Sequence, residues 1–213
     1  MEQNIFKDIY FKRSQLALNA LKKNGFEALY ADSAKEAHDK VMSIVPKEAK
    51  VGVGGSITLK ELGLVEALRE RGNIIFIKSN KKTMEEQIEI RKKALTIDTY
   101  LSSSNAITLQ GQLLNIDSTG NRVAAMIFGP KKVIIIAGAN KLVDTLEEAF
   151  ARIRNIASPL NARRLNLNTP CALTGKCTNC DSPDRICNVT VILERRPKRS
   201  DITIILVGEH LGY

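Results

Sequence analysis

The chain has 213 residues, of which 44% are hydrophobic and 26% charged, enough apolar material to bury a core and to fit a single globular domain. Its 6 prolines and 13 glycines exclude collagen-like and Pro/Gly-rich disordered chains, and its apolar runs are far shorter than the roughly 20 residues that cross a bilayer. The opening MEQNIFKDIYFKRSQ mixes acids and bases and has no apolar segment of the secretory kind, so we expect a cytoplasmic protein that does not contact a membrane.

The formal net charge is +9, and much of the excess lies in one stretch. Residues 159–200 hold eight bases and three acids, together with all four cysteines of the chain. Such an excess can serve nucleic acid, an acidic metabolite or an acidic protein. No aromatic side chain is interleaved with these bases, which argues against nucleic acid and favours a small anionic metabolite.

Helical and strand patterns alternate along the chain. An amphipathic helix is expected over 5–24, and Gly25 would end it, because glycine readily takes the left-handed conformation just past a helix C-terminus. Three boxes of the form S/T-x-x-E, beginning at Ser33, Thr58 and Thr83, mark the starts of three further helices. In chain order we expect a helix at 5–24, a strand at 28–30, a helix from 33 that ends before Pro46, a strand at 50–53, a helix after the glycine turn at 54–55, a strand at 74–77, a helix at 83–95, strands at 99–102, 107–109 and 113–116, a helix at 121–128, a strand at 133–137, a helix at 144–156, and strands at 189–193 and 202–207.

This alternation predicts an α/β fold, a three-layer sandwich around a mixed, largely parallel sheet. Gln110-Gly111 supplies a tight turn between two neighbouring strands, so one hairpin would add antiparallel pairing. We expect residues 1–213 to form one domain, within which residues 168–190 form a small cysteine-rich loop module.

A glycine turn follows the first buried strand. The segment VGVGGSITLKELG places Gly54, Gly55 and Ser56 between the strand at 50–53 and a helix, where free N–H groups favour an anion. It is not a Walker A loop, and the dinucleotide fingerprint GxGxxG would need glycine at Ile57. Glycine turns also join strands to helices without any ligand, so a bound anion and a purely structural turn both stay open here.

Two later strand ends carry a second set of polar residues. Gly120, Asn121 and Arg122 open a helix just after one strand, and Asn140 and Lys141 follow the most apolar strand of the chain. Because the carboxyl ends of parallel strands share an edge, we expect these residues to meet the glycine turn in one cleft, with Arg122 and Lys141 supplying charge for a carboxylate or phosphate. Taken singly, each is explained as a turn or helix-capping residue. No Ser/His/Asp arrangement is legible, so the sequence assigns no catalytic residue.

All four cysteines fall in one short, turn-rich segment. Cys171, Cys177, Cys180 and Cys187 have the spacing C-x5-C-x2-C-x6-C, and in a reducing compartment they are expected to be thiols or metal ligands rather than disulfides. Four thiolates suit a tetrahedral zinc site or a cubane iron–sulfur cluster. A four-cysteine zinc ribbon has two CxxC pairs and this loop has one, so we favour an iron–sulfur cluster of the 4Fe-4S type over zinc, with unligated thiols as the third interpretation.

The run SNAITLQGQLLNIDSTGNRVAAMIFGPKKVIIIAGANKLV, from Ser104 to Val143, resembles the LUD domain of the lactate-utilisation family. The upstream GVGGSITLKELG and the first helix fit the same family, so the resemblance covers about residues 1–157 and includes all eight residues of the predicted anion site. It implies the NagB/RpiA/CoA-transferase-like fold, which ribose-5-phosphate isomerase and glucosamine-6-phosphate deaminase share. After Ser158 the cysteine-rich tail departs from the pattern of the lactate-utilisation subunit and is typical of a subgroup of short LUD-domain proteins.

The resemblance implies a role in the use of lactate or another small organic acid, beside iron–sulfur proteins that oxidise lactate to pyruvate. The chain would then be an accessory or electron-transfer-linked subunit with a four-cysteine metal site. Its partners would be iron–sulfur oxidoreductase subunits and, as in relatives on this fold, further copies of itself. The alternative is an enzyme that acts on a sugar phosphate or an acyl-CoA, by analogy with other proteins of this fold.

Overall fold

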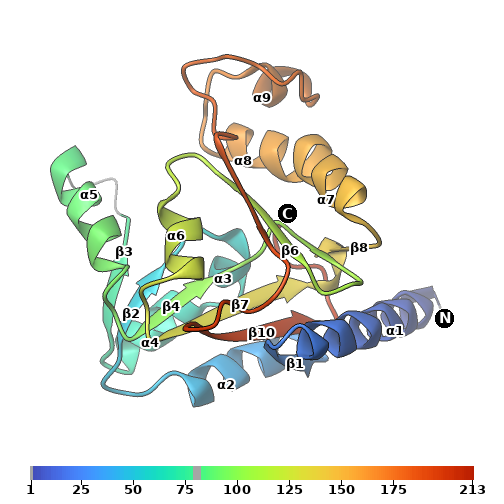
Figure 1. The fold of residues 1–213 in the computed structure, drawn as a ribbon, viewed down its shortest axis with the longest axis vertical. Helices are drawn as coiled ribbons and strands as arrows, with labels where there is room; N and C mark the ends of the chain where they lie inside the picture. The colour runs from blue at the N-terminus through green and yellow to red at the C-terminus, as the bar shows by residue number, and fades with distance from the viewer. Residues whose placement is uncertain (1, 79–82) are drawn as a thin grey trace.

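The computed structural model describes residues 2–78 and 83–213 (Figure 1). At its centre lies a parallel sheet whose six strands have the order β1-β10-β7-β4-β2-β3. The strands are, in that order, β1 (Glu27–Ala31), β10 (Asp201–Val207), β7 (Lys132–Gly138), β4 (Thr99–Ser102), β2 (Lys50–Val53) and β3 (Ile74–Ile77). β7 and β10 pair along their whole length, from Lys132 opposite Asp201 to Gly138 opposite Val207. The last strand of the chain therefore lies inside the sheet and not at its edge.

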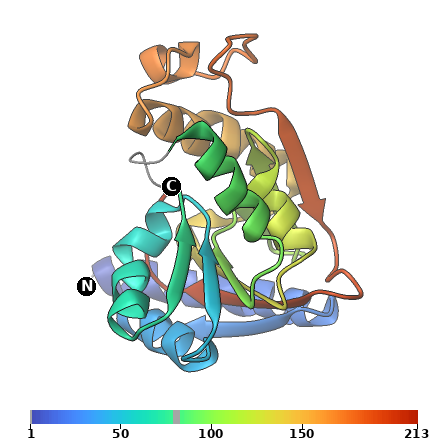
Figure 2. The ribbon, with the colours of Figure 1, turned by 90° about the vertical axis from the view of Figure 1, so that its left-hand side faces the viewer.

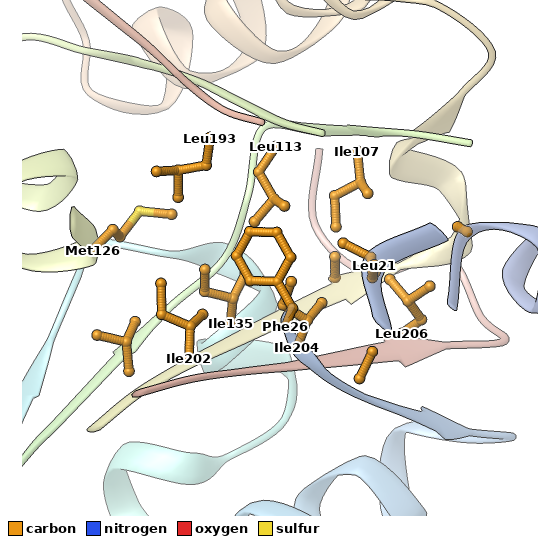
Figure 3. Packing of buried hydrophobic residues seen from close by; sticks show 14 of the residues in the cluster. Leu21, Phe26, Ile107, Leu113, Met126, Ile135, Leu193, Ile202, Ile204 and Leu206 are labelled. Carbon is orange, nitrogen blue, oxygen red and sulfur yellow. The ribbon is translucent and has the colours of Figure 1, made fainter. Parts of the chain in front are cut away.

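Both faces of this sheet are covered, which is why β7 reads as the near-continuous apolar run KVIIIAG. Its side chains alternate between two cores, because Val133, Ile135 and Ala137 pack into one and Ile134 and Ile136 into the other. Figure 3 shows the first core, in which Ile135 and side chains of β10 face those of a second sheet. The predicted layered α/β architecture is confirmed.

Helices complete the two cores. α2 (Ala34–Ile44), α3 (Ile57–Glu61) and α4 (Leu64–Glu70) supply one, while α1 (Glu2–Lys23) and α6 (Asn121–Ile127) supply the other together with the second sheet. None of the helices in the described part of the chain is long and apolar enough to cross a membrane.

All three predicted helices begin where expected, and two of the three predicted capping residues are confirmed. The side chain of Ser33 accepts a hydrogen bond at the start of α2, and that of Thr83 does so in a reciprocal capping box at the start of α5 (Met84–Lys93). The box predicted at Thr58 is wrong. Ser56 caps α3 instead, because the helix begins directly after the glycine turn, and Thr58 is buried in its first turn.

The second sheet is mixed and lies over one face of the first. Its strands are, in spatial order, β8 (Leu142–Val143), β5 (Ala106–Thr108), β6 (Leu113–Asp117) and β9 (Val189–Leu193). The predicted hairpin turn at Gln110-Gly111 is present, closed by a hydrogen bond from the Gly111 N–H to the Thr108 carbonyl at 2.9 Å. Its strands do not join the parallel sheet, because Ile107 and Leu113 pack down onto that sheet and make a separate layer.

A longer, irregular helix replaces the one predicted at 144–156. It runs from α7 (Leu146–Arg152) through a π-helical turn (Ile153–Ala157) into α8 (Ser158–Arg164). Pro159 lies in the first turn of α8 and has no N–H to donate. The wider π turn lies just before the proline and accommodates the absence of this N–H, so the helix continues through Pro159.

Candidate functional site

A cavity of about 530 Å³ lies at the carboxyl ends of β2, β4 and β7. Parallel sheets bind ligands at this edge, and the volume falls within the range of small-molecule sites. Its walls come from the turn after β2, the end of β4 and the serines after it, α5, the loop that leads into α6, the residues after β7, and the π-helical turn with α8. Figures 1 and 2 both place α8 and α9 (Pro170–Thr174) at the end of the molecule opposite α2.

The cavity brings together six of the eight residues predicted for an anion site. These are Gly54, Gly55, Ser56, Asn121, Arg122 and Lys141. Gly120 and Asn140 are not part of the lining. Gly120 precedes α6 in the left-handed conformation, with a φ of 80°. Asn140 holds the C-terminal residues, because its carboxamide donates to the Gly212 carbonyl at 3.2 Å and accepts from the Leu211 N–H at 3.1 Å.

The described lining of the cavity is strongly cationic. Five basic side chains line it against one acidic side chain, Asp117. The bases are Lys78, Arg91, Arg122, Lys141 and Arg164. The Asp117 carboxylate already accepts hydrogen bonds from the backbone N–H groups of Ser118, Arg122 and Val123, at 3.0 to 3.3 Å. A cavity of this charge favours carboxylates and phosphates.

Arg122 is held by the protein itself. Its two terminal nitrogens donate to Asn115 Oδ1 at 2.8 Å, Asn105 Oδ1 at 3.1 Å, the Ile116 carbonyl at 2.9 Å and the Ser103 carbonyl at 3.3 Å. These four hydrogen bonds use every N–H group of the two nitrogens. Arg122 therefore ties the end of β4 to β6 and contributes its charge to the cavity, but those nitrogens have no free N–H for a bound anion.

Lys141 has a different environment. A short helical turn after β7 (Ala139–Lys141) buries the residue to 3% exposure, and its Nζ donates to Thr58 Oγ1 at 2.8 Å and to Ser103 Oγ at 2.9 Å. None of the ion pairs in the described part of the chain involves Lys141. Burial, and then the positive charge of Arg152, lower the pKa of its amine to about 7. Such an amine can serve as a base or a nucleophile near neutral pH.

The sequence prediction did not include the two hydroxyls that bind Lys141. Ser103 directly follows β4 and belongs to the polar run SSSN that begins at the last residue of this strand. A polar run at a strand end could have indicated this residue as part of the site. Thr58 was interpreted as a helix cap. Its hydroxyl donates instead to the Leu211 carbonyl at 3.3 Å, a contact across 153 residues that no local pattern predicts.

The two glycines of the turn after β2 have different surroundings. A Cβ at Gly54 would lie 3.2 Å from the Tyr100 hydroxyl and 3.4 Å from Ser102 Oγ, so close packing explains this glycine. A Cβ at Gly55 would meet nothing within 4 Å. Burial raises the pKa of Tyr100 to about 12, so its phenol keeps the proton at any physiological pH.

The four cysteines line a second, smaller pocket of about 70 Å³. The thiol of Cys187 donates to Ser158 Oγ at 3.3 Å, and the Asn179 N–H donates to Cys177 Sγ at 3.5 Å. Four thiols around one space are the donor set of zinc or of an iron–sulfur cluster. Within the described ranges, however, no three His, Cys, Asp or Glu side chains stand close enough to hold a metal ion as they are placed. The donor set fits a metal, and the loop would need to close further around it.

Arg185 organises this cysteine loop. Its guanidinium donates to the Cys187 carbonyl at 3.0 Å, to the Cys180 carbonyl and to Asn179 Oδ1 at 3.0 Å. Asn179 has a left-handed backbone, with a φ of 50°, which turns the chain between the paired cysteines. A cation at this place also offsets the negative charge that four thiolates carry.

The two pockets share part of their walls. Ile116 at the end of β6, Ser158 at the start of α8 and Ile186 in the cysteine loop line both of them. The cysteine site therefore adjoins the cationic cavity, although the two are built from different parts of the chain.

A sequence-family model of the LUD domain matches residues 15–207. The chain belongs to the LUD-domain family. The match extends past residue 157, where the resemblance in sequence was expected to end, and reaches β10, an interior strand of the parallel sheet.

Among solved structures, this LUD-domain protein is similar to a DUF162 family protein from Deinococcus radiodurans, with a TM-score of 0.55 and 12% identity over 94% of this chain and 98% of the other. At that identity the likeness shows the fold alone. Ribose 5-phosphate isomerase A from Neisseria gonorrhoeae matches with a TM-score of 0.35 and 18% identity over 60% of this chain and 64% of its own. No match was found among curated protein sequences.

Proposed function

We propose that this LUD-domain protein takes part in the oxidation or reduction of a small organic acid. The acid binds in the cationic cavity, beside a redox-active metal centre that the four cysteines hold. The wall common to the two pockets, formed by Ile116, Ser158 and Ile186, supports this proposal, since the thiols line a pocket that adjoins the cationic cavity.

Cys171, Cys177, Cys180 and Cys187 would hold the centre, and an iron–sulfur cluster bound there would take up and release single electrons. Arg185 holds the loop around the thiols, and the Asn179 N–H donates to a sulfur, as groups that orient metal ligands do.

The cavity supplies the substrate side of the reaction. Its basic side chains attract the carboxylate, and Ile116 and Ile186 make part of the common wall apolar. Lactate is the first acid to test, because the family resemblance implies its oxidation to pyruvate. In that role the chain is an electron-transfer-linked subunit. The electrons taken from the acid, or given to it, pass between the cysteine-bound centre and iron–sulfur oxidoreductase partners.

One observation favours a second candidate function. Lys141 is a buried amine with a pKa of about 7 at the wall of the cavity, a property of residues that transfer protons or form covalent intermediates. An enzyme that acts on an anionic metabolite without redox chemistry would use Lys141, and a zinc ion at the cysteines would then be structural.

Anaerobic purification of the full chain, followed by analysis of iron, sulfide and zinc, tests the redox proposal. We expect iron and sulfide in stoichiometric amounts and broad visible absorption that decreases on reduction. Cys177→Ser and Cys180→Ser should each remove the iron and the absorption, because the described chain has no spare cysteine. Leu173→Ala is the matched control in the same loop, since this side chain is 70% exposed.

Two results would contradict the redox proposal. Stoichiometric zinc without iron would make the cysteine site structural. Unaltered metal content in the cysteine variants would show that the metal is bound elsewhere.

A further inference from the structure

Lys141 is a buried amine that three elements surround without giving it an acidic partner. The turn after β7 carries it, α3 supplies the Thr58 hydroxyl, and the residue after β4 supplies the Ser103 hydroxyl. Both hydroxyls are neutral, and a buried charge without a partner is costly. The side chain nevertheless lines the cavity, so a molecule bound there can reach the amine.

The charged groups that act on Lys141 come from the elements around it. Arg152 in α7 and Arg122 in α6 disfavour its protonation, and Glu61 in α3 favours it more weakly than burial and Arg152 oppose it. Glu61 is itself occupied, since its carboxylate accepts the Gly212 N–H at 2.6 Å. A large fraction of the Lys141 amine is therefore neutral at neutral pH and carries a free electron pair.

Desolvation and a neighbouring cation are the two conditions that make a lysine nucleophilic toward carbonyl compounds, and Lys141 meets both. Ser103 Oγ and Thr58 Oγ1 lie within hydrogen-bond distance of the nitrogen and can carry protons to and from it. The cationic lining attracts a carboxylate to the same cavity. The cavity thus offers an amine that can react with a carbonyl group and cations that can bind a carboxylate. A ligand that carries both of these groups is a keto acid.

We propose that Lys141 forms an imine with the carbonyl carbon of a 2-oxo acid bound in the cavity. The nitrogen electron pair adds to the carbonyl carbon, and the carbonyl oxygen takes up, one after the other, the two protons that the amine nitrogen loses. Release of that oxygen as water leaves a carbon–nitrogen double bond, with no oxidant or reductant consumed. This inference deepens the proposed function and rests on its first part, the binding of a small organic acid in this cavity.

Reductive trapping tests the inference directly. Full-length protein is incubated with pyruvate and sodium borohydride, and its mass and peptide map are recorded. We expect one addition per chain, equal to the mass of pyruvate less one oxygen atom, on the peptide that contains Lys141. Lys141→Arg keeps a long basic side chain, cannot form an imine and should abolish the addition. Lys35→Arg is the matched control, since the Lys35 side chain is 88% exposed.

The outcomes separate this inference from the proposed function. Oxalate, an acid without a ketone carbonyl, is titrated into wild type by calorimetry in parallel. Oxalate binding without any trapped adduct overturns the imine and leaves the acid-binding cavity standing. An adduct spread over exposed lysines, unchanged in Lys141→Arg, overturns the imine as well. Absence of both binding and adduct overturns the acid-binding part of the proposed function. Equal melting temperatures of wild type and Lys141→Arg show that a lost adduct is not a loss of folding.

Discussion

Three cations lie around the carboxyl end of β7, and the protein uses them in different ways. Arg122 makes four hydrogen bonds to protein oxygens. Arg152 donates to the Asn140 carbonyl at 3.1 Å and to the Asn105 carbonyl at 2.6 Å, and burial lowers its pKa to about 10. Both arginines stay charged and connect loops. Of the three, Lys141 alone donates only to hydroxyls and has a pKa near neutrality.

Arg122→Ala should chiefly destabilise the fold. The substitution removes four charge-assisted hydrogen bonds that tie the end of β4 to β6, and we expect a loss of about 3 kcal/mol or more in the free energy of unfolding. Arg91→Ala removes another cation of the cavity, and we expect its stability to stay within about 0.5 kcal/mol of wild type. Its affinity for oxalate should fall roughly two- to fivefold. Urea unfolding and calorimetry measure the two effects, and equal stability of the two variants would refute the structural role of Arg122.

Lys141 should make stability depend on pH in a definite direction. Its folded-state pKa of about 7 lies below the ordinary value of 10.5, so between these values the unfolded state binds more protons. The free energy of unfolding therefore rises with pH in this window, by up to about 1.4 kcal/mol per pH unit. Lys141→Met removes this titration. In urea unfolding, the free energy of unfolding of wild type minus that of the variant should therefore rise from pH 7 to pH 9. Parallel pH curves for the two proteins would show an ordinary amine pKa.

At the scale of elements, local signals predicted the helices and strands that depend on local physics. The apolar run of β7 and the capping residues Ser33 and Thr83 are examples, since burial on both faces and free N–H groups at helix starts leave direct traces in sequence. The hairpin at Gln110-Gly111 was also predicted, but its place in a separate sheet was not. Which sheet a strand joins depends on the layer that covers its apolar face, and Ile107 and Leu113 find that layer in distant strands.

The hairpin turn offers a test of how closely it packs. Gly111 has a φ of 77°, and a Cβ there would lie 2.7 Å from the backbone nitrogen of Leu21 in α1. Gly111→Ala should cost about 1–2 kcal/mol for the left-handed backbone and about 1–3 kcal/mol more for the clash. Gly72→Ala is the matched control, because Gly72 has a φ of 98° and nothing within 4 Å. Thermal or urea unfolding should rank Gly111→Ala as the less stable variant, and the reverse order would contradict this packing.

At the scale of the whole molecule, the chain returns to the centre of its sheet after the cysteine loop. β10 pairs with β1 on one side and β7 on the other. Sequence patterns identified the strand at 202–207 but could not place it, because strand order depends on pairing partners that lie far apart in the chain. The same long-range closure brings Ile186 of the cysteine loop to the cavity and Leu211 to Thr58. The cavity and the cysteine pocket therefore adjoin because of long-range pairing, which no single sequence motif predicts.

If the cysteines hold the proposed metal, its loss should loosen the cysteine loop and leave the sheet intact. Residues 168–190 contain few large apolar side chains, and Leu173 is 70% exposed, so without a metal the loop depends on Arg185 and a few hydrogen bonds. Limited proteolysis should cut Cys177→Ser, or chelated wild type, within this loop, while metal-loaded wild type is protected. After the cut, the fragment that contains β10 should stay bound under native gel filtration, because β10 is paired along both edges. Equal protection of wild type and variant, with metal in neither, would refute the metal clamp, and separation of the fragments would show that the loop holds the sheet together.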